Sequence, residues 1–169
     1  DEGDSRTLAV YDLSAAEAGT KNFYLREYRV LHDLRDTGVV PAVQDPFPWS
    51  DDQYLVVPTA IPEGVSLSAL TRPDSEDGAI HEVAVAAAAY RALGAIHAKE
   101  VSHRGIGPDT VYVASDEKGA PAVSLTGFFA ERIGGEATIT PDLEGIRITD
   151  PYAAPEVVVG YGFAGPESD

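Results

Sequence analysis

The histidines are the side chains best suited to bind a metal, and their spacing argues against a metal site. The chain has four of them, His32, His81, His97 and His103. No two are separated by three residues, the spacing that places two imidazoles on one helix face, and His81-Glu82 is not followed by the second histidine of H-E-x-x-H. Cysteine is absent, which excludes thiol nucleophiles, disulfides and thiolate-bound zinc. We therefore expect no resident metal or other cofactor.

Two short motifs that often carry chemistry do not support an activity. Residues 160–165 read G-Y-G-F-A-G and match the glycine spacing of a dinucleotide-binding turn. That turn needs a helix that begins within the glycines and an acid about 20 residues later, whereas Pro166 follows here. We interpret the segment as a loop. The G-x-S-x-G pattern of acyl-transferring serines is missing from the sequence.

The elements that would position any site are short strands and two amphipathic helices. Hydrophobic periodicity predicts strands over 7–13, 39–43, 54–57, 110–114 and 122–126, and helices over 23–34 and 79–97. Turn chemistry is expected at 45–52 and 116–119, and a long irregular stretch at 127–152. Pro58 and Pro62 predict a connector without regular structure over 58–64. Early strands followed by a long helix indicate an α+β fold.

Composition limits the partners of the chain. Its 169 residues include 12 Lys and Arg against 28 Asp and Glu, a net charge of −16. Nucleic acid and anionic membranes bind cationic surfaces, so neither is expected as a partner. The longest apolar stretch, 83–96, is too short and too rich in alanine to cross a bilayer. Methionine is absent and no secretion signal stands at the start, so we expect a cytoplasmic piece of a larger protein.

Residues 96–113 read I-H-A-K-E-V-S-H-R-G-I-G-P-D-T-V-Y-V and resemble the catalytic loop of eukaryotic-type Ser/Thr protein kinases, L-H-x-x-x-I-V-H-R-D-L-K-P-x-N-I-L-L. The segment 125–129, L-T-G-F-F, stands where those kinases carry L-x-D-F-G. Residues 149–156, T-D-P-Y-A-A-P-E, are similar to the end of their activation segment. The upstream landmarks follow in family order: the strand of the nucleotide-binding Lys at 8–11, the helix of its partner Glu at 25–28, the hinge strand at 54–57 and the start of the lower lobe at 63–67.

The resemblance implies a protein-kinase-like fold of two lobes that is incomplete at both ends. The small β-rich N-lobe would occupy 1–60, with the third strand, the C helix and the fourth and fifth strands. The larger, mainly helical C-lobe would occupy 61–169 and include an activation-segment-like stretch at 127–156. Asp169 would begin a long buried helix, so we expect the Leu93 and Ile96 face of the preceding long helix to be exposed without it.

The residues that carry the chemistry of the family are replaced. Phosphoryl transfer needs a Lys, two metal-holding side chains and an aspartate base. The four corresponding positions hold residues that cannot supply these groups: Tyr11 for the Lys, Gly105 for the base, Thr110 for the metal-binding Asn and Gly127 for the metal-binding Asp. The resemblance therefore implies a degenerate kinase domain of bacterial type, a pseudokinase.

The residues that hold the family fold together are retained. His103, Phe128 and Leu31 match members of the internal hydrophobic spine, and Glu27 matches the helix carboxylate, either solvated or paired with Arg26 or Arg104. Arg104 would face an activation-segment phosphate, or the acids Glu136, Asp142 and Glu144 in its place. The remaining fold positions are Thr149 and Glu156 of the activation segment, and Asp169, which in the family binds the backbone at His103 and Arg104.

A residual adenine pocket would be formed by Ala9, Val57, Pro58, Ala60 and Tyr112. The Pro58 carbonyl and the Ala60 N–H are the hinge groups that an adenine would use. The resemblance thus leaves three hypotheses open. The first is an inactive regulatory or scaffolding module that binds another protein or a neighbouring domain. The second is an atypical phosphotransferase or nucleotidyl transferase that uses displaced residues. The third is a switch without turnover that binds ATP weakly and independently of Mg²⁺.

Overall fold

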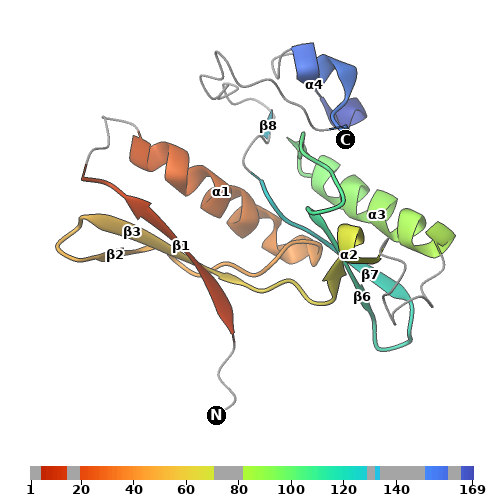
Figure 1. Ribbon diagram of the computed structural model, residues 1–169, viewed down its shortest axis with the longest axis horizontal. Coiled ribbons are helices and arrows are strands. Elements are labelled where there is room, and N and C mark those ends of the chain that lie inside the picture. The colour runs from red at the N-terminus through yellow and green to blue at the C-terminus, as the bar shows by residue number, and fades with distance from the viewer. Residues whose placement is uncertain (1–4, 15–19, 71–81, 129–131, 134–150, 160–164) are drawn as a thin grey trace. The chain divides into compact units, whose positions relative to one another are not determined.

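A computed structural model describes residues 5–14, 20–70, 82–128, 132–133, 151–159 and 165–169 of the chain (Figure 1). It is a mixed α+β structure that divides into two compact units, Asp1–Pro62 and Glu63–Asp169. The division falls at 62/63, and the sequence predicted a lobe boundary at 60/61. The two units are described separately below.

Unit 1 contains a three-stranded antiparallel sheet with the strand order β1-β3-β2. Strand β1 is Arg6–Asp12, β2 is Phe47–Trp49 and β3 is Tyr54–Ala60. The register pairs Ala9 with Val57 and Tyr11 with Leu55. Strands β1 and β3 confirm the strands predicted at 7–13 and 54–57. The sheet side of the unit 1 core comes from β3, whose Leu55, Val56 and Val57 are buried, whereas Leu8 and Val10 of β1 are exposed.

Strand β2 corrects the turn predicted over 45–52. The turn is confined to residues 50–53, and the first three of these have left-handed backbone with φ between 53° and 63°. Proline disfavours strands because it lacks an N–H, but β2 is an edge strand, where an N–H that points away from the sheet has no partner to lose. Pro48 therefore pairs with Leu55 without breaking the ladder.

The segment 39–43 is not a strand, and β3 extends into the predicted connector. Only an isolated bridge links Val43 to Thr59. Pro58 lies inside β3 because its backbone faces 42–44 rather than β1: its carbonyl accepts a hydrogen bond from Gln44 N–H at 2.9 Å. Within an antiparallel strand the N–H and C=O of a residue face the same side, so the missing N–H of Pro58 removes no β1–β3 bond.

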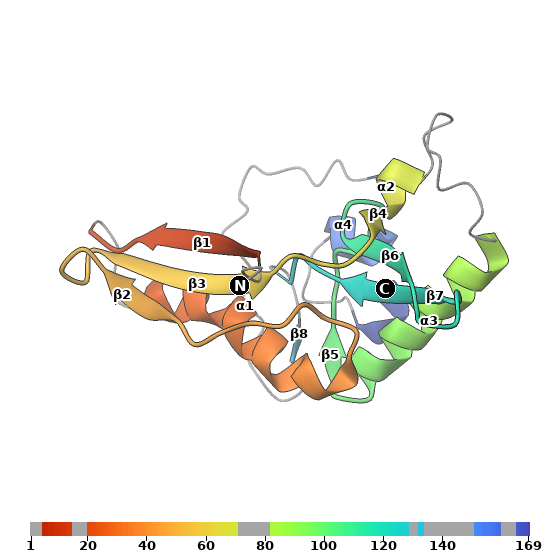
Figure 2. The same ribbon diagram turned by 90° about the horizontal axis from the view of Figure 1, so that it is seen from below.

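Helix α1, Thr20–Leu34, covers one face of this sheet (Figure 2) and confirms the helix predicted over 23–34. Val30, Leu31 and Leu34 are buried on its inner side. The helix passes into a 3-10 turn at Arg35–Thr37 and ends at Gly38, which has a φ of 69° that favours glycine.

Unit 2 is built on helix α3, Glu82–His97, and a second antiparallel sheet. The sheet order is β4-β6-β7, with β4 at Val65–Ser66, β6 at Val111–Ser115 and β7 at Pro121–Leu125. Helix α3 packs against β7. Strands β6 and β7 confirm two predicted strands to within one residue. Their turn is held by the Asp116 carboxylate, which accepts hydrogen bonds from Lys118 and Ala120 N–H at 2.8 Å.

The prediction that the Leu93 and Ile96 face of α3 is exposed is wrong. Leu93 is 8% exposed and Ile96 is fully buried, because this face of the helix packs within unit 2 against the sheet. The exposed apolar residues of α3 are Val83 and Tyr90, at 74% and 76%. The apolar surface therefore lies near the start and on the outer side of the helix.

The sequence did not predict the short elements of unit 2. A strand of two residues is too short to show an alternation of apolar and polar side chains, so hydrophobic periodicity cannot predict it. Strands β5 and β8 pair within the catalytic-loop-like and the predicted irregular regions. The short elements are α2 at Leu67–Leu70, β5 at Val101–Ser102, β8 at Arg132–Ile133, α4 at Pro155–Val159 and a 3-10 helix at Pro166–Ser168.

Candidate functional site

The positions expected to meet nucleotide phosphates lie in β1 and α1 of unit 1. Tyr11, which the resemblance aligned with the family's Lys, is half-buried in β1. Glu27 is half-buried and Leu31 is 4% exposed, both on α1. A tyrosine at position 11 offers no ammonium to a phosphate, so the Glu27 carboxylate has no lysine at this position to orient.

The hinge groups that would bind adenine are already used by the chain. The Pro58 carbonyl accepts from Gln44 N–H at 2.9 Å, and the Ala60 N–H donates to the Ala42 carbonyl at 2.7 Å. An adenine ring would have to displace the second bond, since an N–H has one proton to donate. Tyr112, expected on the other side of adenine, lies half-buried in β6 and pairs with Ser66 and Ser124.

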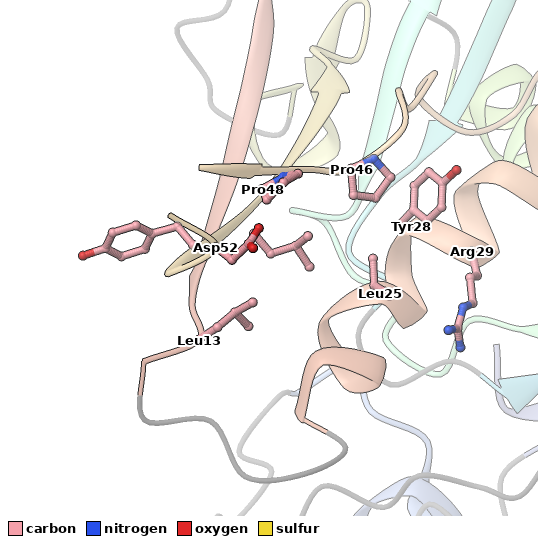
Figure 3. Close-up of a pocket in the computed structure, with 9 residues that line it drawn as sticks. Leu13, Leu25, Tyr28, Arg29, Pro46, Pro48 and Asp52 are labelled. Atoms are coloured by element: carbon pink, nitrogen blue, oxygen red, sulfur yellow. The ribbon is translucent and has the colours of Figure 1, made fainter. Parts of the chain in front are cut away.

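A pocket of about 360 Å³ opens in unit 1 between α1 and the β2–β3 part of the sheet (Figure 3). We call it the α1–β3 pocket. Leu13 and Leu25 face it from β1's end and from α1, and the Tyr28 ring lies beside Pro46 (Figure 3). The sequence did not predict this pocket, because its wall combines residues from four separate segments. Its lining residues are Leu13, Leu25, Tyr28, Arg29, Pro46, Pro48, Asp52, Tyr54 and Leu55.

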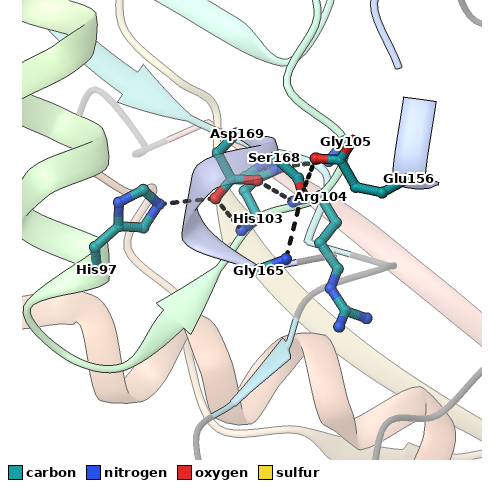
Figure 4. Close-up of polar contacts among 8 residues, drawn as sticks. All are labelled: His97, His103, Arg104, Gly105, Glu156, Gly165, Ser168 and Asp169. Carbon is teal, nitrogen blue, oxygen red and sulfur yellow. Dashed lines mark hydrogen bonds and ion pairs between the residues drawn. The ribbon is translucent and has the colours of Figure 1, made fainter. Parts of the chain in front are cut away.

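In unit 2, the Asp169 carboxylate binds the backbone of the catalytic-loop-like segment (Figure 4). Its Oδ2 accepts from His103 N–H at 2.7 Å, and its Oδ1 accepts from Arg104 N–H at 2.5 Å. The side chain of Asp169 is completely buried. This is the contact that the resemblance implied for Asp169, and it binds a loop from 65 residues earlier in the chain.

His97 adds a third contact to this carboxylate and was not predicted to do so. Its Nε2 lies 2.8 Å from Asp169 Oδ2. His97 is the last residue of α3, and the resemblance implied no contact for it with Asp169. A carboxylate that receives several donors in a buried site is held in one position, because losing a donor there leaves a buried charge underpaired.

His103 is fully buried and its two ring nitrogens have different partners. Nε2 lies 2.8 Å from the Thr126 carbonyl, and Gly105 N–H donates to Nδ1 at 3.2 Å. These contacts fit a neutral ring with the proton on Nε2. Burial lowers the pKa of His103, an effect that the Thr126 carbonyl and Asp169 oppose. The ring also packs on buried Phe128, with centroids 4.4 Å apart.

The loop after His103 is closed by Thr110, not by a charged side chain. The Thr110 hydroxyl accepts from Gly107 N–H at 2.9 Å and lies 3.0 Å from the Gly105 carbonyl. The hydroxyl that stands at the metal-binding position is thus engaged within its own loop. Gly127 has a φ of 78°, a conformation that side chains rarely adopt, and offers no carboxylate.

Arg104 is 3% exposed and has left-handed backbone with φ of 63°. Figure 4 shows its side chain extending away from the Asp169 carboxylate that binds its N–H. The acids expected opposite it, Glu136, Asp142 and Glu144, and the activation-segment residue Thr149 lie outside the described residues.

Glu156 is contacted by a hydroxyl from the same short segment that carries Asp169. The Ser168 hydroxyl donates to Glu156 Oε1 at 2.6 Å, and this bond lowers the pKa of Glu156 (Figure 4). Ser168 Oγ also accepts from Gly165 N–H at 3.3 Å. Adjacent residues 168 and 169 thus connect α4 with the His103–Arg104 segment.

Within the described ranges, no group of three or more His, Asp or Glu side chains is arranged to hold a metal ion. The helices in the same ranges include none with the length and apolar character needed to cross a membrane. No protein-family model and no curated protein matches the chain.

Proposed function

We propose that the chain is a catalytically inactive, protein-kinase-like domain that acts as a regulatory protein-interaction module of a larger signalling protein. The observation that carries this proposal is the buried Asp169 carboxylate on the His103 and Arg104 N–H groups, at 2.7 and 2.5 Å. The contact supports the resemblance because it links the two segments that the family joins in the same way.

Inactivity follows from the chemistry of the loop that this contact holds. Phosphoryl transfer depends on placing charge around the transferred group, which requires metal-binding and base side chains. Gly105 and Gly127 have no side chain, and the Thr110 hydroxyl is engaged by Gly105 and Gly107. The loop backbone is held in place by hydrogen bonds, but Gly105, Thr110 and Gly127 place no charged side chain in it. This combination favours a role in binding rather than in catalysis.

The use of the hinge by the chain itself favours this role over that of a nucleotide switch. The Ala60 N–H, which would bind adenine, donates to Ala42, and the Pro58 carbonyl accepts from Gln44. Nucleotide binding would therefore lose the hydrogen bond that the Ala60 N–H would donate at the hinge. A signalling domain without turnover and without ATP would act through protein surfaces.

The test is a phosphate-transfer assay on the chain with Mg·ATP labelled at the γ-phosphate, with itself and a generic protein as acceptors. We expect no labelled protein. The matched control is Ala9→Trp, which fills the space over β1 without touching the loop. Label on the wild-type chain that Ala9→Trp abolishes would show that the domain is an enzyme.

A further inference from the structure

The two edges of the unit 1 sheet differ in how well they are protected against pairing with a further strand. The β2 edge has three residues and includes Pro48, and short length and proline both discourage pairing. The β1 edge has seven residues, Arg6–Asp12, without proline or lysine (Figure 1). The part of the chain that the structure describes places no strand on the outer side of β1. This long edge is therefore the one that can accept another strand.

The register of the sheet shows which backbone groups of β1 face outward. The Leu13 N–H donates to the Gln53 carbonyl at 2.8 Å, so residue 13 faces β3. Backbone direction alternates along a strand, so Leu8 and Val10 direct their N–H and C=O groups away from β3. The pairing of Leu8 with Pro58 agrees, because the Pro58 carbonyl also points away from β1, at Gln44. Leu8 and Val10 thus each present one donor and one acceptor at the edge.

The side chains of the same two residues are apolar and exposed. Leu8 is 57% and Val10 is 51% exposed, and alternation places both on one face of the sheet. On that face Val10 is next to Val56, which in turn pairs with Phe47 of β2, itself 44% exposed. Contiguous exposed apolar surface marks interaction sites, and here it continues to the open edge.

The sequence of β1 is complementary to itself when two copies run antiparallel. With a two-fold axis at Ala9, Leu8 lies opposite Val10 of the second copy, so the outward backbone groups of both strands meet. The same register places Arg6 opposite Asp12 of the second copy, and opposite charges at facing positions favour pairing. An axis at Leu8 or Val10 would also match the backbone groups, but would separate these two charges. Charge complementarity therefore selects the register centred on Ala9.

We propose that two copies of the chain associate through β1 in this register and join their three-stranded sheets into one continuous sheet. The contact would form about eight backbone hydrogen bonds, two for each facing pair of outward residues. Because both copies use the same surface, the assembly closes as a dimer. One strand edge is a small interface, below roughly 1,200 Å², so we expect a dissociation constant on the order of 100 µM. The inference goes beyond the proposed function and requires neither nucleotide nor phosphate transfer.

Sedimentation velocity of the full chain from about 10 µM to about 1 mM tests the dimer. About 0.15 M salt screens the repulsion between two chains of net charge −16. Val10→Pro removes an outward N–H without removing a β1–β3 bond, and should weaken the dimer at least about tenfold. The matched control Val10→Thr keeps the N–H and the branched side chain, and should weaken it no more than about threefold. Circular dichroism verifies that both variants fold.

The absence of cysteine from the chain allows a direct test of the register. Ala9 faces itself across the two-fold axis, as a pair whose Cα atoms would be about 4.5 Å apart, within the range of a disulfide. Ala9→Cys should therefore form a cross-linked dimer on mild oxidation at about 200 µM. Thr7→Cys is the control, because residue 7 faces Tyr11 of the second copy, and it should give at least about fivefold less cross-linked dimer.

Charge exchange tests the same register without relying on a single variant. Asp12→Lys and Arg6→Glu should each be monomeric alone, because each places like charges opposite each other. An equal mixture should form dimers again, since Arg6 of the first variant meets Asp12 of the second, and the introduced Lys meets the introduced Glu. Recovery in the mixture would show that neither variant failed through loss of its fold.

A monomer at every concentration, with Ala9→Cys uncross-linked, would show that another segment covers the β1 edge and would overturn the proposal. Equal cross-linking of Ala9→Cys and Thr7→Cys, or a Val10→Pro dimer as tight as wild type, would overturn it by placing the association elsewhere. The phosphate-transfer assay tests the proposed function separately. A chain that transfers phosphate and still pairs through β1 would overturn the proposed function and support the dimer.

Discussion

The Asp169 cluster and the adjoining 105–110 loop lie next to each other in unit 2 and use polar groups in opposite ways. In the cluster, a buried carboxylate receives two backbone N–H groups and lies 2.8 Å from His97. In the loop, the polar side chain of Thr110 bonds only to the backbone of the loop itself. The one charged side chain of the loop, Asp109, accepts a hydrogen bond from the Ser68 hydroxyl.

This difference separates the requirements of shape from the requirements of chemistry. A buried carboxylate is costly unless its donors are in place, so removing one of the donors to Asp169 should lower the stability of unit 2. A loop that served phosphoryl transfer would spend its side chains on metal and substrate instead. Substitutions in the Asp169 cluster should therefore lower the free energy of unfolding. Nucleotide, which the 105–110 loop would have to bind, should have little effect on stability.

The largest expected effect comes from Gly64, which fixes the edge strand β4 against β6. Its φ is 82°, and a Cβ at this position would overlap the Val113 carbonyl. Left-handed backbone and overpacking together should cost about 4 kcal/mol in Gly64→Ala. The matched control is Gly119→Ala in the β6–β7 turn, where φ is 77° and the added Cβ meets nothing within 4 Å.

Chemical denaturation of both variants measures this difference. Gly119→Ala should lose about 1 kcal/mol, the cost of the backbone conformation alone. Equal losses for the two variants would show that the close approach of Gly64 to the Val113 carbonyl does not contribute to the loss of stability.

The next largest effect is expected at Asp169. Replacing it with Asn keeps the shape but supplies one acceptor oxygen in place of two, so one buried N–H of His103 or Arg104 loses its partner. We expect a loss of about 2–3 kcal/mol in the free energy of unfolding. The control is Glu156→Gln, which should lose less, since that carboxylate accepts from the more exposed Ser168. If Asp169→Asn were as stable as wild type, the cluster would not be a stabilising feature.

The sequence predicted the long elements with a clear hydrophobic period. It did not predict the short strands, whose conformation depends on the strands that pair with them. Strands β1, β6 and β7 and helices α1 and α3 were recovered, because their apolar residues repeat over enough positions to identify a face. Strand β2 was missed because Pro48 signals a turn, and only its place at a sheet edge makes it compatible with a strand. The strands β5 and β8 have two residues each, too few to show a hydrophobic period.

In the candidate site, the resemblance predicted one contact, that of Asp169 with the backbone at 103 and 104. The other contacts of the site could not be predicted from the sequence. The contact of Asp169 with His103 and Arg104 came from the family resemblance, not from any local pattern. The use of the Ala60 N–H by Ala42 depends on the path of a non-regular segment, which a sequence does not reveal. The same is true of the α1–β3 pocket.

A smaller effect should appear in the pH dependence of the cluster. The pKa of His103 is lowered by burial, so below its ordinary value of 6.5 the unfolded chain binds a proton that the folded chain does not. Stability is then fully present above pH 6.5 and is lost as the pH falls, by at most about 1.4 kcal/mol per pH unit. Unfolding measured from pH 7.5 to 5 should show this slope in the wild type and not in His103→Phe. An identical slope in both would assign it to other groups.

The smallest effect expected is that of Mg·ATP on the melting temperature, and it bears most directly on the 105–110 loop. In the kinase-like binding mode that the proposal assumes, nucleotide would lack a hinge donor, because the Ala60 N–H is bound to Ala42, and a metal-binding carboxylate, because position 127 is Gly. At about 5 mM, a ligand with a dissociation constant no tighter than its concentration stabilises by no more than about 0.4 kcal/mol, a shift of roughly 1–2 °C for a domain of this size. We expect a shift within that limit, and the same shift when Mg²⁺ is removed with EDTA. A large stabilisation that requires Mg²⁺ would mean that the loop binds a charged ligand after all, and that the contrast between it and the Asp169 cluster does not separate shape from chemistry.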